Sequence, residues 1–313
     1  MCKQKGEIDV NKNALLQLSI AMTIFGSIGF FSTFTGLPAI ELVWVRCICA
    51  AVFLIMAWIV SGRFKREKWN RKELIYIACC GITNVCNWVF LFKAFERTSI
   101  TIAITLYHLA PIIVLVIGSL FFKEQKTKLM YVSMLVCFIG TLSIIGTDGV
   151  RFASESWRGI VYSIIAACFY AATMLLGKSI TKTSVYATTF IQMVIGLIVL
   201  LPFIHFNNYQ AIDTSQWMYV TVTGVIHTGI VYFLFFNSIR HLPTIVVSSM
   251  VFVDPTVAIL LDVFFGNVYL RWLQLFGILC IFIGLFYSLK ASSHIASITE
   301  ENYITRTGKV RRQ

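Results

Sequence analysis

The stretch Phe138-Ile139-Gly140 returns 144 residues later as Phe282-Ile283-Gly284, and this repeat decides the fold. Pro111 and Pro255 are separated by the same 144 residues. Each copy of the repeat contains five long apolar segments. A unit that crosses a membrane an odd number of times must place its second copy upside down, so we predict two inverted repeats.

The composition of the chain excludes an ordinary soluble domain. Of its 313 residues, 58% are hydrophobic and 13% are charged, whereas soluble domains are about 25% charged. A membrane-spanning helix needs roughly 20 apolar residues, and lipid leaves no partners for exposed backbone groups, which favours helices. We therefore predict an all-α integral membrane protein with ten transmembrane helices, at residues 14–34, 40–60, 74–92, 99–122, 129–147, 159–177, 184–204, 217–236, 243–266 and 270–289.

The basic residues indicate the orientation of these helices. The net charge is +12, and 20 of the 26 Lys and Arg residues fall on the side of the N-terminus. The cytoplasmic side carries this excess, so both termini are expected in the cytoplasm, on a protein of the cytoplasmic membrane. The basic run 63–72 serves this orientation rather than nucleic-acid binding. The predicted organisation is one five-helix repeat over 1–150, a second over 151–290, and a basic tail over 291–313.

No cofactor or metal site is expected. The nine cysteines show no metal-ligand spacing, and buried cysteine usually acts as a small hydrophobe. No G-x-x-x-x-G-K-[ST] motif is present, so ATP is not the predicted energy source. A gradient of the substrate or of a coupled ion is expected to supply the energy.

Asp254 is the strongest candidate for a functional group. It lies midway along the segment 243–266, directly before Pro255, which interrupts helical hydrogen bonding. Ionisable groups within a membrane cost roughly 2.5–3.5 kcal/mol and are functional candidates by default. Asp254 is therefore expected to carry a proton or meet a cation. The alternative is a protonated Asp bonded to a neighbouring backbone or hydroxyl group.

His108 ends a predicted polar stripe just before Pro111. The stripe follows one helical face, which we expect to look into the bundle, through Thr98, Thr101, Thr105 and His108. A His and an Asp at similar depth, here His108 and Asp254, could relay protons or bind a zwitterion. The alternative is a packed, hydrogen-bonded histidine.

Further candidates for substrate binding lie on three other segments. Asn84, Asn87 and Trp88 form one polar-aromatic face, and an offset of 143 residues matches Asn84 with His227. Two interpretations of Arg46, which matches Gln192 by an offset of 146, stay open: it attracts a substrate carboxylate, or it pairs with Glu41. Tyr107 is a candidate for lining a cavity, although core packing is the commoner role of such an aromatic.

Small residues are expected where helices approach closely. The sequence predicts such contacts at Gly26, Gly29, Gly118, Gly140, Gly196 and Gly284. Segments 129–147 and 270–289 are almost wholly apolar, so we place them at the periphery or in a contact between two copies of the chain. The cavity is expected between the repeats, lined by segments 14–34, 74–92, 99–122, 159–177, 217–236 and 243–266.

Several motifs together resemble a known family. They are FGSIGFF (25–31), Arg46 within VWVRCICAA, TSITIAITLYHLAPIIVLVIGSLFFKE (98–124), VSSMVFVDPTVAILLDVFFGN (247–267) and GILCIFIGLFYSL (277–289). In this order and spacing they resemble the EamA-type members of the drug/metabolite transporter superfamily. The resemblance covers roughly residues 14–290 and implies ten helices in two five-helix repeats.

Inverted repeats are typical of secondary transporters with a substrate site near the bilayer midplane. We expect a carrier for a small polar or amphipathic metabolite, such as an amino acid, and the resemblance favours export by proton exchange. A flippase for lipid-linked sugars and a drug-efflux carrier stay open within the same class. A membrane-embedded enzyme using His108, His227 and Asp254 is the alternative from another class, and a channel is a third. The expected partners are a small-molecule substrate, the lipid bilayer and a second copy of the chain.

Overall fold

The structure is a computed structural model that describes residues 11–67, 69–98, 100–122, 127–145, 156–265 and 271–310. All regular secondary structure of these residues is helical, with turns and short irregular stretches between the helices. The first half contains α1 (Lys12–Thr33), α2 (Ala39–Val60), η1 (Phe64–Arg66), α3 (Arg71–Arg97), α4 (Ile100–Tyr107), α5 (Ala110–Phe121) and α6 (Lys128–Ile145).

The second half begins with two helices, α7 (Ser156–Ser179) and α8 (Val185–Leu200), and two short 3-10 turns, η2 (Leu201–Phe203) and η3 (Phe206–Gln210). A long helix follows in three parts: α9 (Thr214–Gly224), a π-helical segment η4 (Val225–Ile230), and α10 (Val231–Ile239). The chain then forms α11 (Thr244–Met250), α12 (Val253–Phe265) and α13 (Trp272–Val310).

Eight helical stretches of the described chain are long and apolar enough to cross a membrane. Two of these stretches are the composite helices Thr214–Ile239 and Thr244–Phe265. The fourth and fifth predicted segments contain the shorter apolar helices Ala110–Phe121 and Lys128–Ile144. The predicted all-α membrane fold is confirmed, and the number of ten crossings stays a prediction.

Polar side chains fix where several helices begin. Asn11 accepts a hydrogen bond from the backbone N–H of Ala14 at the start of α1, and Asn70 does the same at the start of α3. Asp213 and Gln216 form a reciprocal capping box at the start of α9. Such caps satisfy N–H groups that have no partner within the helix.

Prolines break the fourth and ninth predicted segments in the same way. Pro111 lies in the first turn of α5, and α4 ends at Tyr107, four residues earlier. Pro255 lies in the first turn of α12, and α11 ends at Met250, five residues earlier. A proline ring clashes with the carbonyl four residues before it and removes one hydrogen bond. The predicted helix break at Pro255 is confirmed.

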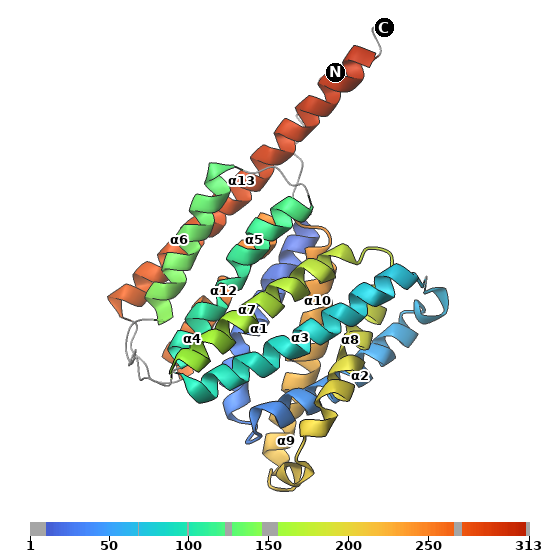
Figure 1. The fold of residues 1–313 in the computed structure, drawn as a ribbon, viewed down its shortest axis with the longest axis vertical. Coiled ribbons are helices and arrows are strands. Elements are labelled where there is room, and N and C mark those ends of the chain that lie inside the picture. Colours follow the sequence, from blue (N-terminus) through green and yellow to red (C-terminus); the bar gives the residue numbers. More distant parts are fainter. Residues whose placement is uncertain are drawn as a thin grey trace.

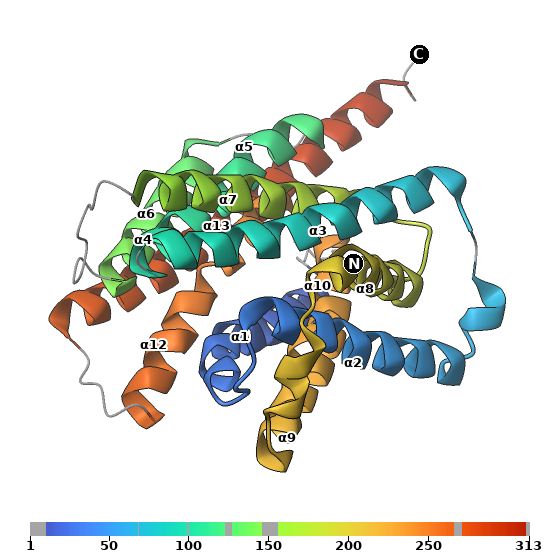
Figure 2. The same cartoon turned by 60° about the horizontal axis from the view of Figure 1, so that its bottom comes forward.

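Helices of the first half pack against helices of the second half across the whole bundle, so the two halves do not form separate units (Figures 1 and 2). Helix α1 packs on α10 and α12 of the second half, while α7 packs on α3, α4 and α5 of the first. Helix α2 packs on α8, and α6 packs on α13. The contacts of α1 with the second half therefore correspond to those of α7 with the first half. The pairs α2–α8 and α6–α13 each join two helices that hold the same position in their halves.

Helices α6 and α13 lie together at one edge of the bundle (Figure 1). A methyl group on Gly140 would lie 2.6 Å from the carbonyl oxygen of Gly277, so the two backbones touch. Five of the six predicted glycine contacts are confirmed: Gly26, Gly118, Gly140, Gly196 and Gly284. The prediction for Gly29 is wrong, because nothing lies within 4 Å of a methyl group placed there. Helix α13 runs on past the bundle to Val310, so most of the predicted basic tail is helical.

Candidate functional site

Polar side chains from both halves meet between α3 and α10. Asn84 of α3 is 2% exposed, and its Oδ1 accepts a hydrogen bond of 3.4 Å from the Tyr232 hydroxyl of α10. The Trp88 ring lies edge-on to the Tyr232 ring with 5.9 Å between their centroids. Asn84 and Trp88 thus face the bundle interior, on the helical face that their spacing predicts.

Two tyrosines extend this polar wall toward α12. Tyr107, the last residue of α4, lies beside the side chain of Asn87. The Tyr107 ring stacks on the Tyr170 ring of α7 with 5.1 Å between centroids and 11° between planes. The Asn87 side chain is buried, and its Oδ1 has no hydrogen-bond partner among the described residues. That amide oxygen is therefore available to a donor from outside the protein.

Asp254 lies in the first turn of α12, directly after the helix break. Its Oδ1 is buried and lacks a hydrogen bond within the described chain. The carboxylate lies close enough to Tyr107 and Tyr170 for electrostatic interaction. Helix α1 approaches closely here, since a methyl group on Gly26 would lie 2.6 Å from the Asp254 carbonyl oxygen. A group so placed is costly to bury unless a ligand or a proton balances it.

His108 is a packed, hydrogen-bonded histidine in this structure. Its Nδ1 lies 2.9 Å from the carbonyl oxygen of Ile104, one turn earlier, and its ring stacks on Phe252. The described contacts include no hydrogen bond between His108 and Asp254. The two residues therefore lie near the two helix breaks without forming a pair.

The polar stripe predicted to lead to His108 is wrong at its first residue. Thr98 caps the end of α3 rather than joining α4, and it packs against Gly159 of α7. The chain turns at Thr98 because its extended backbone ends the helix. The side chains of Thr101 and Thr105, the next two residues of the stripe, lie outside the described part of the structure.

Arg46 of α2 does not pair with Glu41. Its Nε donates a hydrogen bond of 2.9 Å to the Thr228 hydroxyl of η4. Residues five apart on a helix point in different directions, because successive residues are rotated by about 100°. The interpretation of an Arg46–Glu41 pair is therefore wrong.

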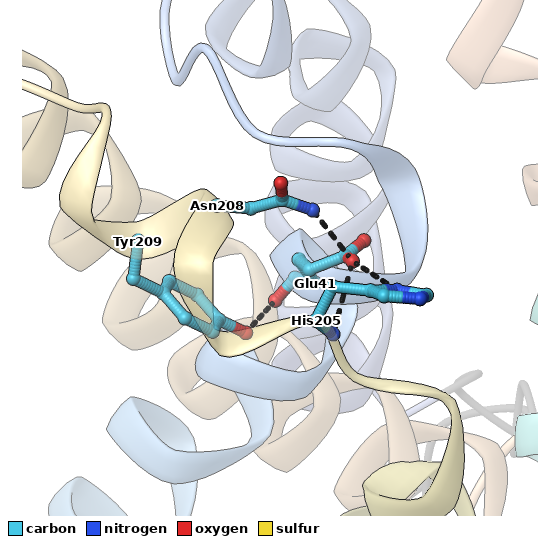
Figure 3. Close-up of polar contacts among 4 residues, drawn as sticks. All are labelled: Glu41, His205, Asn208 and Tyr209. Atoms are coloured by element: carbon cyan, nitrogen blue, oxygen red, sulfur yellow. Dashed lines mark hydrogen bonds and ion pairs between the residues drawn. The ribbon is translucent and has the colours of Figure 1, made fainter.

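Glu41 instead fastens the loop between α8 and α9 (Figure 3). One carboxylate oxygen, Oε1, lies 2.8 Å from Nδ2 of Asn208 and 3.4 Å from Nδ1 of His205. The Tyr209 hydroxyl donates to the Glu41 backbone carbonyl at 2.9 Å. Burial, and then the nearby Glu41 carboxylate, raise the pKa of Tyr209 above its ordinary value. This group of contacts is structural, at one end of α2.

His227 lies in the π-helical segment and contacts α1. Its Nε2 lies 2.9 Å from the Ser27 hydroxyl oxygen, and the Phe31 ring lies 5.1 Å from its own ring. The side-chain hydroxyl of the next residue, Thr228, donates to the carbonyl of Thr223. The π-helical turn Val225–Ile230 itself is of a rare kind that often marks a functional site. Arg46 and His227 are also electrostatic neighbours, so η4 brings both together.

The contact between Ser27 and His227 has an equivalent in the other half. Thr173 of α7 lies 2.9 Å from Thr83 of α3, hydroxyl to hydroxyl. Ser27 and Thr173 are 146 residues apart, and His227 and Thr83 are 144 apart. The structural counterpart of His227 is therefore Thr83, and the predicted match with Asn84 is wrong by one residue.

Four residues of this site were not among the candidates predicted from the sequence. They are Ser27, Tyr170, Thr228 and Tyr232. Ser27 belongs to the glycine-rich stretch FGSIGFF, which was a usable signal. For Tyr170, Thr228 and Tyr232, the sequence offered only one signal, a hydroxyl group in an otherwise apolar helix. The described residues contain no group of three His, Cys, Asp or Glu side chains that could hold a metal ion.

The architecture and the sequence both match known proteins. A solved crystal structure superposes with a TM-score of 0.76 at 14% identity, covering 89% of this chain and 98% of that one, which shows a shared fold. A model of the EamA-like transporter family matches residues 12–146 and again residues 157–290. The chain belongs to the EamA-like transporter family. The resemblance expected from the motifs is thereby confirmed, and the protein is a multi-pass membrane protein.

Relatives of this EamA family member carry transporter names. The chain is similar to "Uncharacterized transporter YxxF" of Bacillus subtilis, with 47% identity over 289 residues that cover 92% of this chain and 93% of the relative. It is also similar to "Uncharacterized transporter PA0485" of Pseudomonas aeruginosa, with 22% identity over 74% of this chain and 77% of the relative. Family and relatives agree on a membrane transporter.

Proposed function

We propose that this EamA family member is a secondary carrier that moves a small polar or amphipathic metabolite, such as an amino acid, across the cytoplasmic membrane. It has ten membrane-spanning helices in two inverted halves, residues 1–150 and 151–290, with both termini in the cytoplasm. Transport proceeds by alternating access, in which the halves expose one central site to each side in turn. Membership of a transporter family supports this class of function.

One observation carries the proposal: unsatisfied polar groups are buried where the two halves meet. Asn87 of the first half and Asp254 of the second each have a buried side-chain oxygen without a partner among the described residues. Buried polar groups normally have hydrogen bonds, and exceptions call for a functional explanation. A substrate with its own donors satisfies both oxygens as it binds.

Asp254 is the proposed proton-coupling group, and the direction of net transport is export. No ATP-binding motif is present in the sequence, so a gradient supplies the energy. Asp254 lies at the α11/α12 break, close to α1, so a small movement of these helices alters its access to water. Protonation on one side and release on the other then link proton flow to substrate flow.

The enzyme alternative has less support. It requires His108, His227 and Asp254 to act on one substrate. The ring of His108 bonds to Ile104, and that of His227 bonds to Ser27. Neither ring contacts the Asp254 carboxylate in the described structure, and catalytic acid–base groups work within hydrogen-bond reach of one another or of a shared substrate.

Counterflow in proteoliposomes tests the proposal. Purified protein is reconstituted with an internal amino acid or amine, and uptake of the labelled external solute is followed. Saturable uptake that depends on the internal solute is the expected result. Flow that never saturates indicates a channel, and formation of a new product indicates an enzyme; either outcome contradicts the proposal.

A further inference from the structure

Arg46 is a buried cation with no counter-ion among the residues that the structure describes. Only 8% of the residue is exposed, and its Nε is bonded to Thr228. Its two terminal nitrogens have no acceptor among the described residues, and no described carboxylate lies within ion-pair distance. Buried charges are normally paired, and a charged group inside a membrane protein marks a functional site by default.

The described carboxylates nearest to Arg46 in sequence or in the site do not balance its charge. Glu41, on the same helix, is bonded to the loop at Asn208 and His205. The electrostatic neighbours of Arg46 are His227, Tyr232 and Cys47, and Asp254 is not among them. The described surroundings of Arg46 are therefore neutral or basic side chains, a setting that favours an anion brought from outside the protein.

The π-helical segment sets this part of the bundle apart from its counterpart. Before the segment, Gly224 faces Cys49 in the same way that Gly81 faces Ile195. Gly224 and Gly81 are 143 residues apart, and Ile195 and Cys49 are 146 apart. The contact of Gly224 with Cys49 thus corresponds to the contact of Gly81 with Ile195 when the two halves are exchanged.

After the π-helical segment, equivalent residues of α3 and of the helix Thr214–Ile239 are one residue further apart in the sequence. A methyl group on Gly229 would meet the Phe53 ring at 2.8 Å and then the Cα of Ala50 at 3.6 Å, and one on Gly196 would meet Cys47 at 3.0 Å and then Val85 at 3.5 Å. The Gly229–Ala50 contact is matched here with the Val85–Gly196 contact. Gly229 and Val85 are 144 residues apart, while Gly196 and Ala50 are still 146 apart. One extra residue has therefore been inserted between Gly224 and Gly229, and the wider π-helical turn accommodates it.

The insertion coincides with a difference in charge between the halves. Arg46 stands where the other half has the neutral Gln192, and the imidazole of His227 stands where it has Thr83. Gln192 is also buried, and its Oε1 accepts a weak hydrogen bond from Cys80 at 3.5 Å. The bundle therefore has one cationic subsite and one neutral equivalent, related by exchange of the halves.

We propose that Arg46, positioned by Thr228 and adjoined by the His227–Ser27 pair, is the subsite that binds the carboxylate of the transported solute. This inference rests on the proposed carrier function and names the chemical class of its substrate. The two free terminal nitrogens of a guanidinium form a planar fork that matches the two oxygens of a carboxylate. Such a subsite selects an acid over its uncharged amide.

Matched pairs of acids and amides test the inference. The full chain in lipid nanodiscs is screened by thermal unfolding against amino acids and simple carboxylic acids, each beside its own amide. The expected result is that one or more acids raise the unfolding temperature while their amides do not. Arg46→Gln, which copies the residue of the other half, is expected to weaken binding of the acid roughly 10- to 100-fold, the equivalent of one charge-assisted interaction.

Two further variants separate binding from folding. Arg46→Lys keeps the charge without the fork and is expected to bind the acid with intermediate affinity. Gln192→Ala changes the equivalent neutral position and is expected to keep the preference for the acid. The inference is overturned if acids and amides stabilise the wild type equally, if no acid stabilises it, or if Arg46→Gln keeps the preference.

Counterflow of the same solutes distinguishes this inference from the carrier proposal. Saturable counterflow of amines or neutral solutes with none of acids supports a carrier and overturns the carboxylate subsite. Binding of acids without counterflow of any solute overturns the carrier and supports an anion site alone. Counterflow of acids that Arg46→Gln abolishes supports both.

Discussion

Ser27 of α1 and Nε2 of His227 lie 2.9 Å apart, and this contact joins the two halves of the protein at the π-helical segment. Thr173 and Thr83 form the equivalent contact at the same distance. In each case the first helix of one half bonds to the third helix of the other. Thr83 lies on the same helix as Asn84, and His227 on the same composite helix as Tyr232, so the helices that join the halves also carry the candidate site.

Asp254→Asn is predicted to abolish proton-driven accumulation of substrate. The amide keeps the shape of the side chain and some hydrogen bonding, but it does not titrate. Counterflow of substrate down its own gradient needs no change of charge and is expected to survive. Both quantities are measured in proteoliposomes, with and without an imposed pH gradient. A variant that still concentrates substrate in response to that gradient would show that Asp254 is not the coupling group, and His108→Gln would then be tested.

Gly140→Ala is predicted to destabilise the pair formed by α6 and α13. The new methyl group would lie 2.6 Å from the carbonyl oxygen of Gly277, so the helices must separate. Overpacking of this kind costs about 1–3 kcal/mol. Gly29→Ala is the matched control, since its methyl group meets nothing within 4 Å, and it is expected to be neutral or stabilising by up to about 1 kcal/mol. Thermal unfolding in detergent compares the two, and equal effects would contradict the packing shown here.

Glu73→Gln is predicted to loosen the loop between α7 and α8. Glu73 is 6% exposed as a residue, and its carboxylate accepts hydrogen bonds from the backbone N–H groups of Thr181, Lys182 and Thr183. Losing the charge is expected to cost about 2 kcal/mol of stability and to speed proteolysis of this loop. Glu67→Gln, which removes the charge opposite Ser184 alone, serves as the comparison and should have a smaller effect. Unchanged proteolysis in Glu73→Gln would show that these bonds do not hold the loop.

Asp213 is predicted to contribute a pH-dependent part of the stability of α9. Hydrogen bonds from the Gln216 N–H and then the Ser215 hydroxyl lower the pKa of Asp213 below its ordinary value of 3.8. A depressed folded-state pKa means that this contribution is present above the ordinary pKa and is lost as the pH falls through the folded value. Asp213→Asn keeps a good helix cap but should flatten that dependence. Unfolding temperatures of both proteins, followed from neutral pH into this acid range, are compared; parallel curves would contradict the prediction.

Apolar segment length and repeated proline spacing made much of the fold predictable. Pro111 and Pro255 interrupt their helices because proline lacks an N–H and clashes one turn earlier, a local effect that needs no tertiary partner. Close helix contacts were predictable at five glycines and not at Gly29. A glycine permits close approach, but the sequence does not say which helix face meets a neighbour.

The candidate site was less predictable, because its contacts join residues far apart in the chain. Arg46 and Thr228 are 182 residues apart, and Ser27 and His227 are 200 apart. From the sequence, either Glu41 or a substrate carboxylate could be the partner of Arg46. Helix geometry alone excludes Glu41, because residues five apart point in different directions. The one-residue π-helical insertion also moved the counterpart of His227 from Asn84 to Thr83, which alignment by a fixed offset does not detect.

The sequence by itself determined that this is an all-helical membrane protein of the EamA-like family, because segment length, composition and repeat spacing are properties of the chain alone. Only the tertiary structure decided which polar groups meet between the halves, that Arg46 bonds to Thr228 with no described carboxylate beside it, and that Oδ1 of Asp254 is buried without a partner among the described residues. The physical reason is that hydrophobicity selects what enters the membrane, whereas hydrogen bonds and charge pairing depend on distances between helices that packing alone sets.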